Sequence, residues 1–183
     1  IGDTSFDWET LKANRAREIL RLNGIYESLL AKVHVVRGRA TLVDANTVAV
    51  GDQHFSAKTI LIATGGWPQV PDIPGLEHVV TSNEIFDLPM FPKRLVVVGG
   101  GYIASEFASI FNGLGAQVTQ LYRGEQILRG FDDDVRHFAA EEMRKHGVHL
   151  RVSTDVRGIA KTADGLVVTL TDDSTLPADA VLY

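Results

Sequence analysis

A glycine-rich turn between a strand and a helix restricts the fold of this chain more than any other feature of the sequence. The apolar run Arg94–Val98 ends at Gly99–Gly100–Gly101, and Tyr102–Leu114 follows with the pattern of a helix. The alternation of strand and helix continues through Gln117–Tyr122, Asp132–His146 and Val148–Val152. This βαβαβ order predicts an α/β fold with a doubly wound parallel sheet.

The small residues of the turn follow the pattern G-x-G-x-x-A, from Gly99 through Gly100 and Gly101 to Ala104. Gly99 permits a tight turn, Gly101 leaves room for a pyrophosphate, and Ala104 lets the helix pack close to the strand. The helix N-terminus offers free amides and the positive end of its dipole to phosphates. The turn therefore predicts dinucleotide binding, and the alternative is a tight turn with a structural function only.

The residues after the second strand indicate which dinucleotide is bound. An NAD site would place an acidic residue about twenty positions beyond the turn, where it bonds the ribose hydroxyls. This chain has Tyr122–Arg123 at that place, and Arg129 follows. Two guanidinium groups would hold a 2′-phosphate through charge-assisted bonds of about 1.5–3 kcal/mol each. The pattern favours NADP(H), and the alternative is a pair of solvated surface arginines.

The part of the chain before this unit predicts a helix and short strands. Residues 7–33 have the periodicity of a long amphipathic helix, with one apolar face made of Trp8, Leu11, Ile19, Leu22, Tyr26, Leu29 and Val33. The β-branched runs 34–37, 40–43 and 47–50 predict a small antiparallel meander. The continuous apolar run 58–63 is typical of a strand that is buried on both faces.

The prolines of Trp67–Gly75 interrupt the chain in its middle. Proline lacks an amide donor, so this stretch cannot be a central strand and is the best candidate for a domain boundary. We therefore expect two parts, residues 1–65 and residues 66–183. The last segment, 155–183, alternates apolar and polar residues and predicts a three-stranded antiparallel meander.

The composition excludes several kinds of site. With 18 basic and 23 acidic residues, the formal charge is −5, which predicts no general attraction to nucleic acid or to anionic membranes. The absence of cysteine excludes a disulfide framework and a redox thiol on this chain. His137, His146 and His149 lack partners at ligand spacing, so we expect no metal site. The chain opens without a charged-then-apolar leader, which predicts a cytoplasmic location.

Taken together, these motifs resemble the pyridine nucleotide–disulfide oxidoreductases, and among them the glutathione reductases. The run Gly99–Ala108 is similar to the family's NADPH turn, and Leu121–Asp132 is similar to its 2′-phosphate site with Arg123 and Arg129. The resemblance implies that Tyr102 is the ring that covers the flavin. It also implies that Ile103 and Glu106 lie along the nicotinamide half of the coenzyme.

The first part of the chain shares this resemblance. Ile60–Gly66 is similar to the family's second flavin motif, which implies that Thr64 and Gly65 lie close to FAD. Ala40 lies where the family contacts the adenine part of FAD, so residues 1–65 would be part of a flavin domain. Tyr26 would line the cleft for the disulfide substrate, and the alternative is a core aromatic on the helix face.

The resemblance implies a reaction in which NADPH reduces FAD, FAD reduces a cysteine pair, and the cysteine pair reduces glutathione disulfide in a homodimer. Because this chain carries no cysteine, we expect it to be the central part of such an enzyme, inactive alone and weak in holding FAD. Three alternatives remain open at this point. The whole protein could resemble trypanothione reductase, it could resemble the NADH-linked lipoamide dehydrogenase, or it could be an NADP-binding module without catalysis.

Overall fold

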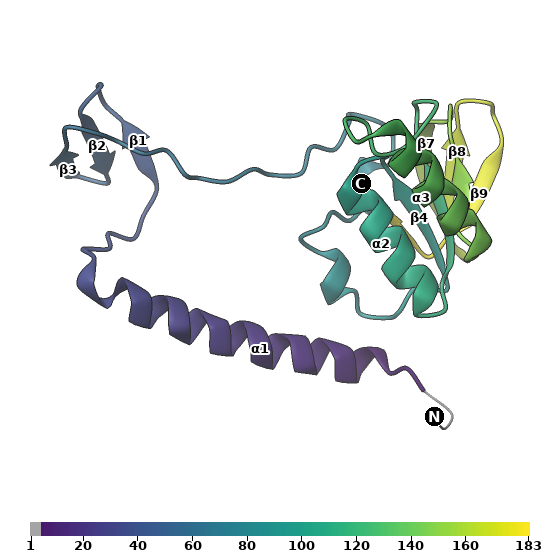
Figure 1. Ribbon diagram of the computed structural model, residues 1–183, viewed down its shortest axis with the longest axis horizontal. Helices are drawn as coiled ribbons and strands as arrows, with labels where there is room; N and C mark the ends of the chain where they lie inside the picture. The colour runs from purple at the N-terminus through teal and green to yellow at the C-terminus, as the bar shows by residue number, and fades with distance from the viewer. Residues whose placement is uncertain (1–4) are drawn as a thin grey trace. The chain divides into compact units, whose positions relative to one another are not determined.

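The computed structural model of the chain describes residues 5–183 (Figure 1). The chain divides into two compact units. The smaller unit is Glu9–Trp67, and the larger unit is Pro68–Tyr183 together with the stretch that ends at Trp8. Each unit is described by itself below.

The smaller unit contains most of one long helix and a small antiparallel sheet. Helix α1 (Trp8–Leu29) is followed by a 3₁₀ turn at Leu30–Lys32. The sheet has the order β1-β2-β3, made of β1 (Ala40–Leu42), β2 (Thr47–Val50) and β3 (Gln53–Ser56). The expected meander is present, but the expectation of a strand at 34–37 was wrong, and β3 takes its place.

The expected long helix is present, and most of its apolar face is exposed, since Ile19, Tyr26 and Leu29 are half or more exposed. One further expectation for this unit was wrong. The run 58–63 forms no strand, and Leu61 in it is 86% exposed. A strand is stabilised by hydrogen bonds to its neighbours, and no strand of the described residues pairs with this run. The apolar sequence of this run would suit a buried strand, but the described residues supply no neighbouring strand for it.

The larger unit is built on a parallel sheet of four strands. Its order is β10-β4-β5-β6, and every neighbouring pair is parallel. The strands are β4 (Arg94–Val98), β5 (Gln117–Leu121), β6 (His149–Arg151) and β10 (Ala180–Leu182). Helix α2 (Tyr102–Gly113) connects β4 to β5, and α3 (Asp133–Lys145) connects β5 to β6, as the sequence predicts.

Helices cover one face of this sheet and a second sheet covers the other (Figure 1). Val97 faces α2, and Leu150, in the same register row, packs against Ala140 of α3. The opposite face packs on the antiparallel sheet of β7 (Val156–Thr162), β8 (Gly165–Leu170) and β9 (Thr175–Ala178). The expected α/β class, with a parallel sheet and antiparallel strands, is confirmed. The end of the expected meander instead forms β10 of the parallel sheet.

An aromatic cluster fills the core under α2. Phe111 is fully buried and stacks on Phe91, with ring centroids 5.6 Å apart. Trp8 lies 5.9 Å from the Phe111 ring and donates its indole N–H to the Leu88 carbonyl. These rings fix the position of α2 and therefore of the turn that precedes it.

Replacing Phe111 with alanine is expected to lower the free energy of unfolding by about 3–5 kcal/mol, since it leaves a cavity among packed rings. Urea denaturation measures the change. The neighbouring Ile110 is 45% exposed on the same helix, so I110A is the matched control. I110A should cost about 1 kcal/mol or less. Equal losses for both variants would contradict the assigned core position of Phe111.

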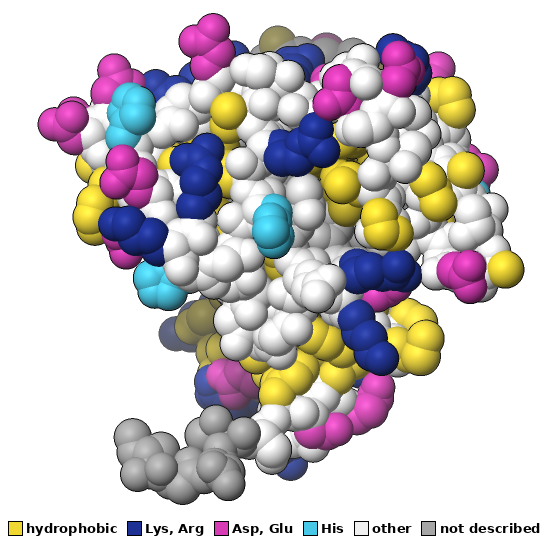
Figure 2. All heavy atoms as spheres, turned by 90° about the vertical axis from the view of Figure 1, so that its right-hand side faces the viewer, with side chains coloured by type: hydrophobic (Ala, Val, Ile, Leu, Met, Phe, Trp, Pro, Cys, Tyr) yellow, Lys and Arg dark blue, Asp and Glu magenta, His cyan; other side chains and the backbone are white. Residues whose placement is uncertain are grey.

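Charges of both signs are mixed on the face shown in Figure 2. On the face shown in Figure 2, Lys and Arg side chains lie among Asp and Glu side chains and do not gather into one continuous basic patch. Among residues 5–183, none of the helices combines the length and the apolar character needed to cross a bilayer.

Candidate coenzyme site

The glycine turn connects the carboxyl end of β4 to the start of α2. Gly99 has a φ of 144°, a backbone conformation that side chains rarely allow, and its N–H donates to the Leu121 carbonyl at 2.9 Å. A Cβ atom placed on Gly99 would lie 3.2 Å from the Cβ of Ala104. The turn and the first turns of α2 are therefore packed closely, and both small residues are needed for that packing.

Gly101 leaves the N-terminus of α2 open. It is the N-cap residue of this helix, and no heavy atom lies within 4 Å of the position a Cβ would take. The first amides of a helix have no partner inside the helix, and they carry the positive end of its dipole. This end of α2 can therefore accept an anionic group at close range.

Three of the predicted residues lie on the first two turns of α2. Tyr102 and Ile103 are 57% and 45% exposed, and Glu106 is exposed one turn later. Residues three and four positions apart share a face of a helix, so Glu106 lies on the same side as Tyr102 and Ile103. These side chains are accessible to a ligand bound along this helix.

Arg123 and Arg129 line one open cleft of about 770 Å³, beside the end of β5 and the start of α3. Neither side chain forms a hydrogen bond or an ion pair within residues 5–183. Two acidic side chains, Glu125 and Asp133, also line the cleft. Asp133 is paired with Arg136, another lining residue, at 2.6 Å. The two free guanidinium groups can therefore bind an anion without first breaking a contact of the folded chain.

The loop that carries these arginines, residues 122–132 (the arginine loop), is hydrogen-bonded to the glycine turn and packs against it. The backbone N–H of Leu128 donates to the Gly100 carbonyl at 2.6 Å. The ring of Tyr122 lies against Gly100 and Gly124, where a Cβ atom at either glycine would overlap it. The turn and the arginine loop are thus packed as one piece.

A second cleft, of about 510 Å³, is also lined by Tyr122. It is lined by Gly99, Tyr122 and Arg123, and also by Gln69–Pro71, Asp155 and Tyr183. Burial, and to a smaller extent the nearby Asp155 carboxylate, raises the pKa of the Tyr183 phenol well above its usual value. Tyr183 therefore stays uncharged at neutral pH. The two clefts share Tyr122 and Arg123, so an extended ligand could occupy both.

The remaining predicted residues belong to the smaller unit and lie on three different segments. Tyr26 is in α1 and 62% exposed, so the alternative of a core aromatic is not seen. Ala40 is the first residue of β1 and is exposed. Thr64 and Gly65 lie in the extended stretch after β3, both exposed. Within this unit, these four residues do not line a common binding site.

Two of the histidines are engaged by helix backbone. The Nδ1 atoms of His137 and His146 lie 2.7 and 2.8 Å from the carbonyl oxygens of Asp133 and Glu142. Among the described residues there is no group of three or more His, Cys, Asp or Glu that could hold a metal ion.

The sequence reasoning missed three residues that support the site. Gln120 is fully buried, and its amide nitrogen donates to the Gly99 carbonyl at 3.0 Å. Leu128 bonds the turn through its backbone, and Arg136 bonds the arginine loop. The spacing of Asp133 and Arg136 fits an ion pair on a helix, but it does not indicate the bonds from Arg136 to the loop. The contacts of Gln120 and Leu128 join segments distant in sequence, which no local pattern reveals.

Comparison with known proteins identifies relatives over almost the whole chain. A glutathione reductase from Burkholderia cepacia is 45% identical over 181 residues, which is 98% of this chain and 40% of that protein. A trypanothione reductase from Leishmania donovani is 40% identical over 174 residues, or 87% of this chain and 35% of that protein. The chain thus spans about two fifths of the length of these relatives.

The fold is also similar to a solved structure, the HOCl-induced flavoprotein disulfide reductase RclA from Escherichia coli. The TM-score is 0.81 with 28% identity, over 98% of this chain and 42% of that one. The family model for pyridine nucleotide-disulphide oxidoreductases matches residues 2–183. The chain belongs to the pyridine nucleotide-disulphide oxidoreductase family.

Proposed function

We propose that this chain supplies the NADPH-binding region of a flavin-dependent disulfide reductase that acts on glutathione disulfide. In this proposal residues 66–183 are the NADP-binding domain, and residues 1–65 are part of the flavin domain. The observation that carries it is the pair of unpaired guanidinium groups, Arg123 and Arg129, in one cleft that is also lined by Tyr122, whose ring lies against Gly100 of the glycine turn. A 2′-phosphate would bind the arginines, and a pyrophosphate would bind at Gly99–Gly101.

The first test is the preference between the two nicotinamide coenzymes. Because an NAD-type acidic residue is absent at Tyr122–Arg123, NADP⁺ is expected to bind about tenfold or more tightly than NAD⁺, a gap of about 1.4 kcal/mol. Isothermal titration calorimetry of the purified protein with each coenzyme measures the gap. Equal affinities would remove the support for an NADPH enzyme and favour a relative that uses NADH, as the lipoamide dehydrogenase alternative requires.

NADPH bound at this site would supply the hydride for the reduction of the disulfide. We assign Tyr102 and Glu106 to the reacting end of the coenzyme, because both are exposed on the turns of α2 that follow the glycines. Ile103 and Ala104 complete this surface. The chain's own contribution is to bind and orient the coenzyme and to leave the helix amides free for its phosphates.

The described residues do not by themselves form a site for FAD. Thr64 and Gly65 follow an apolar run whose Leu61 and Ile62 are 86% and 65% exposed, and Ala40 lies exposed in a separate sheet. A flavin site at these residues therefore needs neighbouring strands that would pair with 58–63. Because the chain has no cysteine, the disulfide chemistry also needs residues beyond these 183.

The substrate is assigned to glutathione disulfide because a glutathione reductase is the relative with 45% identity. The 40% identity to a trypanothione reductase keeps trypanothione disulfide as the second candidate. Rates of NADPH oxidation by the full-length protein with each disulfide distinguish them, and binding of NADP⁺ without any turnover would indicate a binding module. Tyr26 as a substrate contact, the homodimer and the cytoplasmic location stay predictions.

A further inference from the structure

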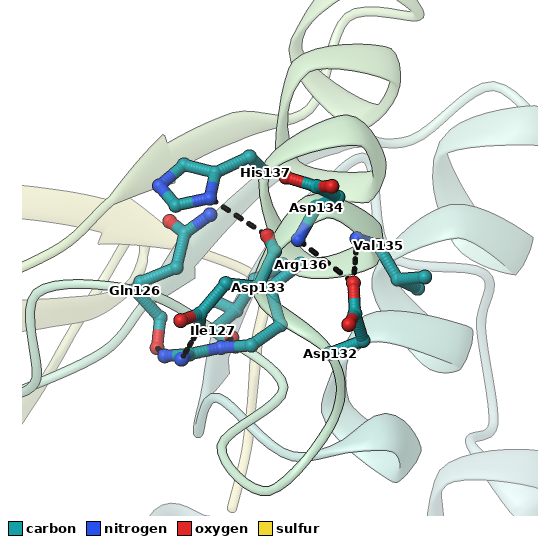
Figure 3. A network of polar contacts seen from close by, with 8 residues as sticks. All are labelled: Gln126, Ile127, Asp132, Asp133, Asp134, Val135, Arg136 and His137. Carbon is teal, nitrogen blue, oxygen red and sulfur yellow. Dashed lines mark hydrogen bonds and ion pairs between the residues drawn. The ribbon is translucent and has the colours of Figure 1, made fainter.

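Arg136 holds the loop that carries Arg129. Its Nε donates to the carbonyl of Ile127 at 2.9 Å, and its Nη2 donates to the carbonyl of Gln126 at 3.0 Å. Its Nη1 bonds the Asp133 carboxylate at 2.6 Å. Figure 3 shows this fork, in which one side chain from the first turn of α3 reaches two consecutive carbonyls of the loop. The Arg136 side chain is only 19% exposed.

The start of α3 keeps this side chain in place. Asp132 caps the helix by accepting bonds from the N–H groups of Asp134 and Val135 (Figure 3). The cap fixes the first turn of α3, and the ion pair with Asp133 orients the guanidinium plane of Arg136 toward the loop. Arg136 is thus held from its own helix before it contacts the loop.

The residues that follow these carbonyls are fixed as well. Ile127 is fully buried against Ala140 and Leu150, and Leu128 has a φ of 58°, which is unusual for a non-glycine residue. Leu128 then bonds the glycine turn through its N–H. Loss of the fork would free two carbonyls immediately before a strained residue, and Arg129 is the next side chain along the chain.

We propose that Arg136 is a positioning residue for the 2′-phosphate site: it holds the loop so that Arg129 stays in the cleft with Arg123. The inference rests on the proposed NADP function and deepens it. Three of the N–H groups of Arg136 are already engaged by the loop and by Asp133. It acts through Arg129, whereas Arg123 and Arg129 have no protein partners within the described residues.

The test is a double-mutant cycle that compares two small probes, 2′,5′-ADP and 5′-AMP, by calorimetry. R136M is expected to weaken 2′,5′-ADP binding about tenfold and to leave 5′-AMP binding unchanged. In an R129M background, R136M should have almost no further effect, because the side chain that it positions is gone. Additive losses would show that Arg136 binds the phosphate directly and would overturn the proposal.

The matched control is R144M, which removes one charge from the same helix at a residue that does not line the cleft. It should leave the ratio of the two affinities unchanged.

R136K retains the charge but not the fork, so its affinity for 2′,5′-ADP should still fall about threefold. This variant carries the test if R136M does not fold. A wild-type affinity of R136K for 2′,5′-ADP would show that the charge at position 136 suffices without the fork of hydrogen bonds, and it would overturn the proposal. A wild-type protein without preference for 2′,5′-ADP would overturn the proposed NADP function itself, whereas a normal preference that persists in R136M overturns only this inference.

Discussion

Replacing both Arg123 and Arg129 with methionine is expected to weaken NADPH binding by about 100-fold or more and to leave NADH binding within about threefold. Each guanidinium is free of protein partners in the part of the chain that the structure describes, so each can give a phosphate charge-assisted bonds of about 1.5–3 kcal/mol. The NADH molecule lacks the 2′-phosphate and therefore loses none of these bonds. Fluorescence titration with both reduced coenzymes measures the two changes.

The charge-retaining variant R123K/R129K separates bond geometry from charge. Lysine keeps the positive charge but lacks the planar fork that matches a phosphate, so part of the preference for NADPH should persist. The preference should also fall with added salt in the wild-type protein, because the cleft is open to solvent. If the double methionine variant lost NADPH and NADH affinity equally, the arginines would be structural and the phosphate would bind elsewhere.

The glycine turn shows what a sequence can reveal about such a site. The positive φ of Gly99 and its contact with Ala104 are local, within six residues, so their spacing alone predicts them. The same holds for α3, which the sequence predicts at 132–146 and the structure has at Asp133–Lys145. Contacts between residues that are close in sequence depend only on the residue types and their spacing. For that reason the order of strands and helices in the larger unit was predictable.

The run 58–63 shows where this reasoning ends. An apolar β-branched sequence indicates that a segment would fit a buried strand, but the strand exists only where neighbours supply hydrogen bonds. Among the described residues no strand does so, and Leu61 is exposed. The two bonds from Arg136 to the arginine loop were invisible for a related reason. They depend on how the loop folds back onto α3, which is a property of the tertiary structure.

Replacing Gly101 with threonine is expected to abolish measurable binding of both NADP⁺ and NAD⁺ while leaving the melting temperature unchanged within a few degrees. The backbone of Gly101 has a φ of −81° and a ψ of 176°, which any residue adopts, and a Cβ there would meet no atom within 4 Å. Threonine and glycine are similarly favourable at an N-cap, so the helix itself should not be weakened. The new side chain instead occupies the space beside the free amides of α2, where the pyrophosphate would bind.

The control for this variant lies at the other end of the same helix. Gly113 is the last residue of α2 and also has open space at its Cβ position, so G113A adds a side chain without approaching the turn. It should bind both coenzymes normally and gain a few tenths of a kcal/mol to about 1 kcal/mol in stability from the higher helix propensity of alanine. The pattern of loss then separates the two parts of the site, since the arginine variants lose only the coenzyme with the extra phosphate and G101T loses both. Normal NAD⁺ binding by a folded G101T protein would mean that the dinucleotide does not approach the N-terminus of α2, and the assignment of the glycine turn would be wrong.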